Sequence, residues 1–229
     1  MPLPVNGFRP AVSLPKPSPP AKAAARIGLH RFVPPAPSGP QKAQAPMSLQ
    51  KLRDALPRYA RDIAHNLAAL AADPVLGEQQ RAGAFVAAAI AARNPVVSAA
   101  LLAEFAPRLS APALEAAKAC AAVTAMTNVY YRFTQRPSND YDRLPARLRM
   151  NALGCTGTDK QDFELWSVAV SAVNGCGVCA DGHARTARDL GLTPEAVQTA
   201  VRIAAVVQAA ATVLDAEAAS AAALPLAAE

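Results

Sequence analysis

Apolar residues, alanine the most frequent among them, recur at helical spacing over most of the chain beyond residue 46. Aromatic residues are few and β-branched runs are short, which favours close-packed helices over a sheet. We therefore predict an all-α fold, a single helical domain over residues 47–229, with its least regular stretch at 134–160. The expected helices span roughly 48–55, 57–72, 77–93, 95–107, 111–133, 142–151, 161–173, 176–190 and 194–217.

Capping and proline signals place the ends of these helices. Ser110 precedes a helix that begins at Ala111-Pro112, and Asn94-Pro95 separates two further helices. Gly191 is expected to end the helix over 176–190. Thr193-Pro194-Glu195 then combines a capping residue, proline at the first helical position and an acid in the first turn.

The pattern also suggests an internal helical repeat. Phe85–Asn94, a helix and Ser110-Ala-Pro112 are similar in order to Leu165–Asn174, a helix and Thr193-Pro194. Duplication explains this similarity, and so does the general likeness of alanine-rich helices. If the repeat is real, only its second copy carries a cysteine pair, and the first copy is scaffold.

Residues 1–46 differ from the rest. They hold 12 of the 21 prolines and six basic residues, and they contain no acid. A segment of this composition, without apolar periodicity, cannot bury enough surface to fold, so a disordered N-terminal extension is expected.

Charge and hydropathy argue against a nucleic-acid-binding protein and against a membrane protein. The net charge of +6 belongs to the extension, because residues 47–229 contain 17 basic and 17 acidic residues. No nucleic-acid surface is therefore expected. No stretch of 18 or more apolar residues lacks charge, and the alanine-rich stretch near 203–214 is too short and too rich in alanine for a membrane span. Four cysteines without a secretory signal indicate a reducing compartment, and we expect a cytoplasmic protein.

The most informative motif is Glu164-x11-Cys176-x2-Cys179-x3-His183. If Cys176 opens a helix, Cys179 and His183 follow at i+3 and i+7 and share one face of it. Glu164 lies on the preceding helix, across an Asn174-Gly175 turn, so it can face the same spot. These four residues are the candidate catalytic group.

Each member suits thiol redox chemistry. A helix N-terminus favours the thiolate, which is the reactive form of cysteine, and a C-x2-C pair can cycle between dithiol and disulfide. His183 can take or relay a proton. Glu164, if buried, is expected to have a raised pKa and to act as a general base.

Other candidates are weaker. A zinc site at the cysteine pair lacks an obvious fourth ligand, since Cys120 and Cys155 are isolated in the sequence. A purely structural disulfide would close only a tiny loop. Cys120 is expected to be a small buried hydrophobe, Trp166 a core or interface residue, and His65 a surface or interhelical residue.

Several segments, together with the cysteine motif, resemble the AhpD family, the alkyl hydroperoxide reductase D proteins of the carboxymuconolactone-decarboxylase-like superfamily. The similarity runs from Met47 to about Glu217. The segments that carry it include Met126-Thr-Asn-Val-Tyr-Tyr-Arg132, Leu148-Arg-Met-Asn151, Phe163-Glu-Leu-Trp-Ser167 and Ser171-Ala-Val-Asn-Gly-Cys176.

The resemblance implies an all-helical homotrimer with an antioxidant role and no tightly bound cofactor. Such proteins reduce an AhpC-type peroxiredoxin with electrons from the lipoyl group of a dihydrolipoamide acyltransferase, and they reduce alkyl hydroperoxides weakly themselves. Cys179 would form the sulfenic acid and the link to the partner, Cys176 would resolve it and donate a proton, and Glu164 and His183 would relay protons. Val178 departs from the family pattern, in which a histidine stands between the cysteines.

Two other classes stay open. A decarboxylase-type member of the same superfamily would use a carboxylate and a histidine without needing both cysteines. A non-catalytic module stapled by zinc would retain its metal. The extension has three explanations, namely a targeting peptide, an appendage, or a start assigned upstream of Met47; the point at which the resemblance begins favours the last.

Overall fold

The structure, a computed structural model, describes residues 48–136, 140–154 and 157–223. Of the two units into which the chain divides, Met1–Ala43 and Gln44–Glu229, only the second contains described residues. The expected disorder of residues 1–46 therefore lies outside the described part of the chain, and so does Cys155.

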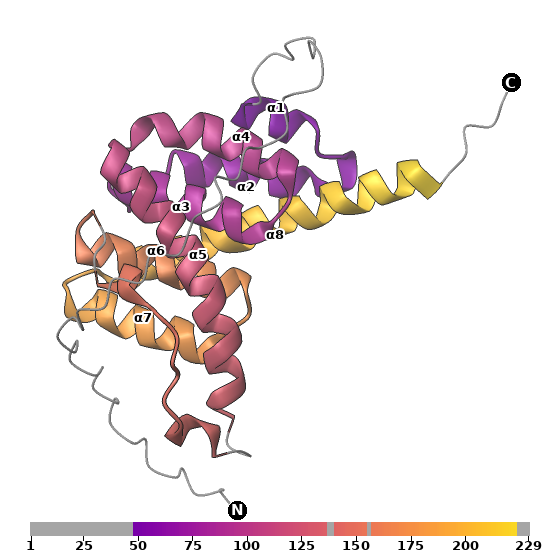
Figure 1. Cartoon of the computed structure of the whole chain (residues 1–229). Coiled ribbons are helices and arrows are strands. Elements are labelled where there is room, and N and C mark those ends of the chain that lie inside the picture. Colours follow the sequence, from indigo (N-terminus) through magenta and orange to yellow (C-terminus); the bar gives the residue numbers. More distant parts are fainter. Residues whose placement is uncertain (1–47, 137–139, 155–156, 224–229) are drawn as a thin grey trace, which may run out of the picture. The chain divides into compact units, whose positions relative to one another are not determined.

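The described residues form helices and no strand (Figure 1), which confirms the predicted all-α fold. The eight α-helices are α1 (Leu49–Asp54), α2 (Arg61–Ala71), α3 (Glu78–Ala92), α4 (Pro95–Phe105), α5 (Ala111–Thr134), α6 (Lys160–Val173), α7 (Gly177–Asp189) and α8 (Pro194–Ala223). Four short 3₁₀ turns are η1 (Arg58–Ala60), η2 (Ala106–Arg108), η3 (Tyr141–Arg143) and η4 (Asn151–Leu153).

Helices begin where the capping residues in the sequence predict. The side-chain oxygens of Asn94 and Ser110 accept hydrogen bonds from the backbone N–H of the third residue of α4 and α5, at 2.9 and 3.3 Å. Thr193 caps α8 in the same way, because its Oγ1 accepts from the N–H of Ala196 at 3.1 Å. These bonds satisfy donors that a helix N-terminus leaves unpaired.

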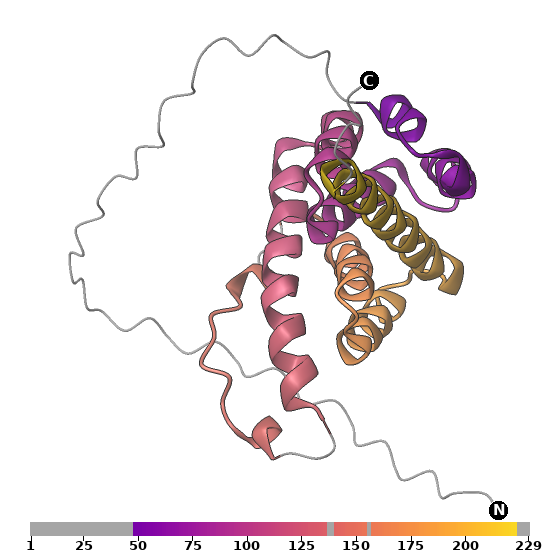
Figure 2. The same ribbon diagram turned by 90° about the vertical axis from the view of Figure 1, so that its right-hand side faces the viewer.

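The irregular stretch differs from expectation. The helix predicted over 142–151 is wrong: the 3₁₀ turns η3 and η4 flank a non-helical segment over 144–150. Pro145 explains the break, since proline cannot donate a backbone hydrogen bond and restricts the residue before it. Figure 2 shows this segment running back beside α5, where the Tyr131 hydroxyl lies 3.7 Å from Sδ of Met150.

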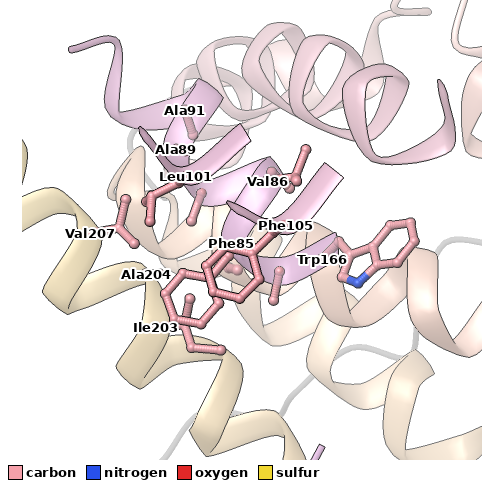
Figure 3. Close-up of a cluster of buried hydrophobic side chains, with 14 of the residues drawn as sticks. Phe85, Val86, Ala89, Ala91, Leu101, Phe105, Trp166, Ile203, Ala204 and Val207 are labelled. Atoms are coloured by element: carbon pink, nitrogen blue, oxygen red, sulfur yellow. The ribbon is translucent and has the colours of Figure 1, made fainter. Parts of the chain in front are cut away.

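Helix α3 forms the centre of the core and packs against α4, α5, α6 and α8. Figure 3 shows its side chains meeting those of the neighbouring helices. The rings of Phe85 and Phe105 stack with centroids 4.2 Å apart, and Ile203 and Val207 of α8 are fully buried in the same cluster. Small alanine side chains let these helices approach closely.

Trp166 of α6 is fully buried, which confirms its expected place in the core. Its indole Nε1 donates to the carbonyl of Gln80 at 3.0 Å. The ring lies so close to Gly83 that a Cβ there would stand 2.1 Å from two ring carbons. Only glycine fits at this contact, so Gly83 lets α6 pack closely against α3.

Helix α8 continues to Ala223, beyond the predicted end at residue 217. The apolar stretch 203–214 is thus part of a 30-residue helix that, by length and composition, could cross a membrane. A single such helix is weak evidence for a membrane span, and within the described residues α8 packs against α2, α3 and α6. Core helices of globular proteins share these properties.

The element order is consistent with the suggested repeat. A well-buried helix, a short helix and a long helix follow one another in α3, α4 and α5, and again in α6, α7 and α8. Duplication itself stays a prediction.

Candidate active site

The turn between α6 and α7 builds the centre of the predicted site. Gly175 takes φ +68°, a conformation that glycine adopts at little cost, and its N–H donates to the carbonyl of Ala172 at 3.1 Å. The N–H of Cys176 donates to the carbonyl of Ser171 at 3.0 Å. This bond pair is a Schellman motif that ends α6, and Cys176 is already the N-cap of α7. Cys176 therefore opens the helix, as the motif predicts.

Cys176 and Cys179 are joined by a disulfide, with their Cα atoms 5.4 Å apart. Cys179 is the third residue of α7, so both sulfurs lie at the N-terminal end of that helix, where unpaired N–H groups favour negative charge. Cys176 is 1% exposed and Cys179 9% exposed. Val178, between them, is 42% exposed and points away from the core.

His183 and Glu164 meet across the interface of α6 and α7, which lie side by side (Figure 1). Nδ1 of His183 lies 2.6 Å from Oε2 of Glu164, and both side chains are mostly buried. His183 follows Cys179 by one helical turn, so it stands on the cysteine side of α7. The structure thus pairs Glu164 with His183 and Cys176 with Cys179, and His183 lies on α7 one turn after Cys179.

The ammonium group of Lys160 also contacts the carboxylate of Glu164. Nζ of Lys160 lies 2.6 Å from Oε1 of Glu164 and donates to the carbonyl of Leu153 at 2.8 Å. Sequence reasoning missed Lys160, although its spacing to Glu164, i and i+4 on one helix, is a recognised pairing signal.

The expected raised pKa of Glu164 is wrong. Burial alone would raise the pKa of this carboxyl, but the hydrogen bonds and charges of His183 and Lys160 outweigh burial and hold the pKa below its usual value. Glu164 is therefore ionised at neutral pH and can only accept hydrogen bonds, so Nδ1 of His183 carries the hydrogen. This leaves Nε2 as the nitrogen that can take a proton.

A hydrogen-bonded network from other helices holds the turn before Cys176. Arg132 donates to the carbonyl of Asn174 at 2.7 Å, and Arg93 donates to its side-chain oxygen at 2.9 Å. The Asn174 amide donates to Asn128 at 3.0 Å, and Asn128 donates to the Ser171 hydroxyl at 3.1 Å. No local sequence signal marks these residues, because α3 and α5 reach the turn only through the tertiary fold.

The remaining cysteine and histidine that the structure describes do not join this group. Cys120 is fully buried, as expected, with its Sγ 3.3 Å from Oγ of Ser167. Burial chiefly raises the pKa of its thiol to about 12, so it stays protonated and unreactive. His65 is exposed on α2.

Metal binding finds no support among the described residues. No group of three or more His, Cys, Asp or Glu side chains is placed to hold an ion. The two sulfurs that a zinc site would need are bonded to each other.

Comparison of the sequence with known proteins indicates one family. Residues 139–223, which include the cysteine motif, match the carboxymuconolactone decarboxylase family. The chain is 53% identical over 173 residues to a protein of Gluconacetobacter diazotrophicus, covering 76% of this chain and 96% of the relative. It is 51% identical over 184 residues to a protein of a Bradyrhizobium species, covering 80% and 100%. Both relatives are named alkyl hydroperoxide reductase AhpD. The chain therefore belongs to the AhpD family.

Proposed function

We propose that this protein is an antioxidant thiol oxidoreductase of the alkyl hydroperoxide reductase type. It reduces an AhpC-type peroxiredoxin with electrons from the lipoyl group of a dihydrolipoamide acyltransferase, and it reduces alkyl hydroperoxides weakly itself. It acts as a homotrimer without a tightly bound cofactor. The names of its relatives support the peroxide-reducing activity; the partners and the trimer follow from the family resemblance.

One observation carries the chemistry of this proposal. A disulfide formed at the N-terminus of α7 is followed, one helical turn later, by a histidine whose Nδ1 is held by an ionised carboxylate. The helix end stabilises a thiolate, and Nε2 of His183 can remove the thiol proton. Nothing in a decarboxylation requires a cysteine pair that closes on itself in this way.

Exposure supports different roles for the two sulfurs. Cys179 is the more accessible at 9%, against 1% for Cys176, so Cys179 is the sulfur that a peroxide or partner protein reaches first. Its thiolate attacks the peroxide oxygen, takes that oxygen as a sulfenic acid and, with one proton, releases the alcohol. Cys176 then attacks the Cys179 sulfur, the disulfide forms, and water leaves.

Exchange with partners uses the same disulfide. A dihydrolipoyl group transfers two electrons and two protons to the Cys176–Cys179 disulfide. The lipoyl group becomes a cyclic disulfide, and both cysteines become thiols. The dithiol then reduces a peroxiredoxin disulfide through a mixed disulfide at Cys179, and Cys176 displaces the partner as a thiol. Each half-cycle moves two electrons, and no free oxidant is needed.

The test is mass spectrometry of variants in which one cysteine at a time is replaced by serine. After a pulse of alkyl hydroperoxide, Cys176→Ser should retain one oxygen on Cys179, and with oxidised peroxiredoxin it should form a trapped mixed disulfide. Cys179→Ser should do neither and should lose all turnover. Cys120→Ser is the matched control, because that buried thiol takes no part.

An oxygen adduct on Cys176 in place of Cys179 would reverse the roles. Failure of a reduced lipoyl domain to reduce the disulfide, while a small dithiol succeeds, would remove the proposed donor. The unmodified protein, assayed for metal and for thiols before and after oxidation, should lose two thiols and contain no zinc.

A further inference from the structure

Lys160 stands outside the predicted group, yet it contacts that group directly. Its Nζ lies 2.6 Å from Oε1 of Glu164, while His183 occupies Oε2 at the same distance. The two oxygens of one carboxylate are therefore each held by a different nitrogen donor. A carboxylate held at both oxygens cannot rotate without breaking a contact.

A plain surface ion pair is the simplest alternative, since exposed pairs at i and i+4 contribute little to stability. Two features argue against that interpretation. The Glu164 side chain is only 7% exposed, although that of Lys160 is 45% exposed. In addition, Nζ donates to the carbonyl of Leu153 in η4, which fixes the ammonium from outside its own helix.

We propose that Lys160 is a positioning residue of the redox centre. By holding Oε1 of Glu164, it keeps Oε2 hydrogen-bonded to Nδ1 of His183, so that Nε2 of the same ring faces the thiols. This inference rests on the proposed function. Lys160 touches neither sulfur nor substrate in this role, and acts through Glu164.

The charged surroundings are consistent with that role. Among the described residues, the ionisable groups that act on Glu164 are Lys160 on its own helix, His183 on α7 and the Cys120 thiol on α5. Cys120 remains neutral, so Lys160 is the one permanent positive charge among these three. Without it, burial would be opposed by His183 alone.

Alkylation of the reduced protein by iodoacetamide measures this effect without any natural substrate. Lys160→Met removes the charge at similar length, and Lys160→Arg keeps it. Lys118→Met is the matched control, because Lys118 forms an exposed pair with Glu115 on α5, at 3.1 Å. Mass spectrometry follows the modification of Cys176 and Cys179 separately, from about pH 6 to about pH 9.

We expect Lys160→Met to be alkylated about tenfold more slowly near neutral pH. This loss is smaller than the rate enhancement that a general base itself supplies, because Lys160 acts only through Glu164. The difference should vanish towards about pH 9, where thiols ionise unaided. Lys160→Arg and Lys118→Met should follow the unmodified protein.

Identical profiles for Lys160→Met and the unmodified protein would overturn the proposal. So would a loss that is equal at every pH and is not rescued by arginine, because it would indicate disturbed packing. If the unmodified protein itself reacted like a free thiol near pKa ~8.5, the proposed redox centre would fail and the role of Lys160 with it.

Discussion

Oε2 of Glu164 lies 2.6 Å from Nδ1 of His183, and this contact joins the helix that is anchored in the core to the helix that carries both cysteines. The imidazole is therefore fixed relative to α6 as well as α7. Loss of the carboxylate should affect the chemistry and the fold in different, separable ways.

Glu164→Gln should slow peroxiredoxin reduction by about 100-fold near neutral pH, the lower end of what a positioned acid–base group contributes. The amide keeps the shape but no longer holds Nδ1 as a charged acceptor, so Nε2 becomes a poorer base. The deficit should shrink as the pH approaches ~8.5, where the thiol ionises by itself. Steady-state rates across pH measure this, and a variant profile parallel to that of the unmodified protein would remove Glu164 from the proton path.

The same carboxyl should make stability depend on pH. Its pKa is lowered in the folded protein, so its contribution is present above the unfolded pKa of about 4.3 and is lost as the pH falls through the folded value. Glu164→Gln should therefore be less stable than the unmodified protein at neutral pH, by about 2 kcal/mol, and the difference should fall in acid. Urea unfolding at two pH values tests the sign; a difference that grows on acidification would contradict it.

Gly83→Ala should destabilise the domain by about 3 kcal/mol or more, because the added Cβ would overlap the Trp166 ring, which has no room to move. Gly182 on α7 provides the matched comparison, since a Cβ there meets nothing within 4 Å. Gly182→Ala should stabilise the helix by about 0.5–1 kcal/mol. Thermal melting of both variants checks the contrast, and equal shifts would mean that the contact with Trp166 does not limit the packing.

Removal of residues 1–46 should leave the melting temperature, oligomer size and turnover unchanged. These residues carry 12 prolines and six basic residues without an acid, so the shortened chain should also lose its basic isoelectric point. Brief proteolysis of the full chain should remove the segment first. A marked loss of peroxiredoxin reduction after truncation would instead identify the segment as a docking element.

Local signals in the sequence predicted most of the fold. Proline, glycine and capping residues act within a few positions of themselves, so the starts of α4, α5 and α8 could be placed from them. The segment over 144–150 could not, because its apolar residues gave a helical spacing that Pro145 overrides. The end of α8 was missed because its alanine-rich tail carries no stop signal before Ala223.

The candidate site shows the same division. The cysteines and His183 share one helix, so their spacing was sufficient to bring them together. The pKa of Glu164 was misjudged because burial was considered without the hydrogen bonds and charges of His183 and Lys160. The hold of Arg93 and Arg132 on the turn before Cys176 depends on where α3 and α5 end, which only the assembled helices decide.

The disulfide between Cys176 and Cys179 spans only three positions in the sequence. Closing so short a loop restricts the unfolded chain by an amount worth about 2 kcal/mol, against nearly 5 kcal/mol for a loop of a hundred residues. The core of α3, α6 and α8 is held by apolar packing that does not involve this bond. In the proposed cycle, oxidation and reduction of the pair can therefore alternate while the domain stays folded, and the dithiol form carries two electrons that the disulfide form lacks.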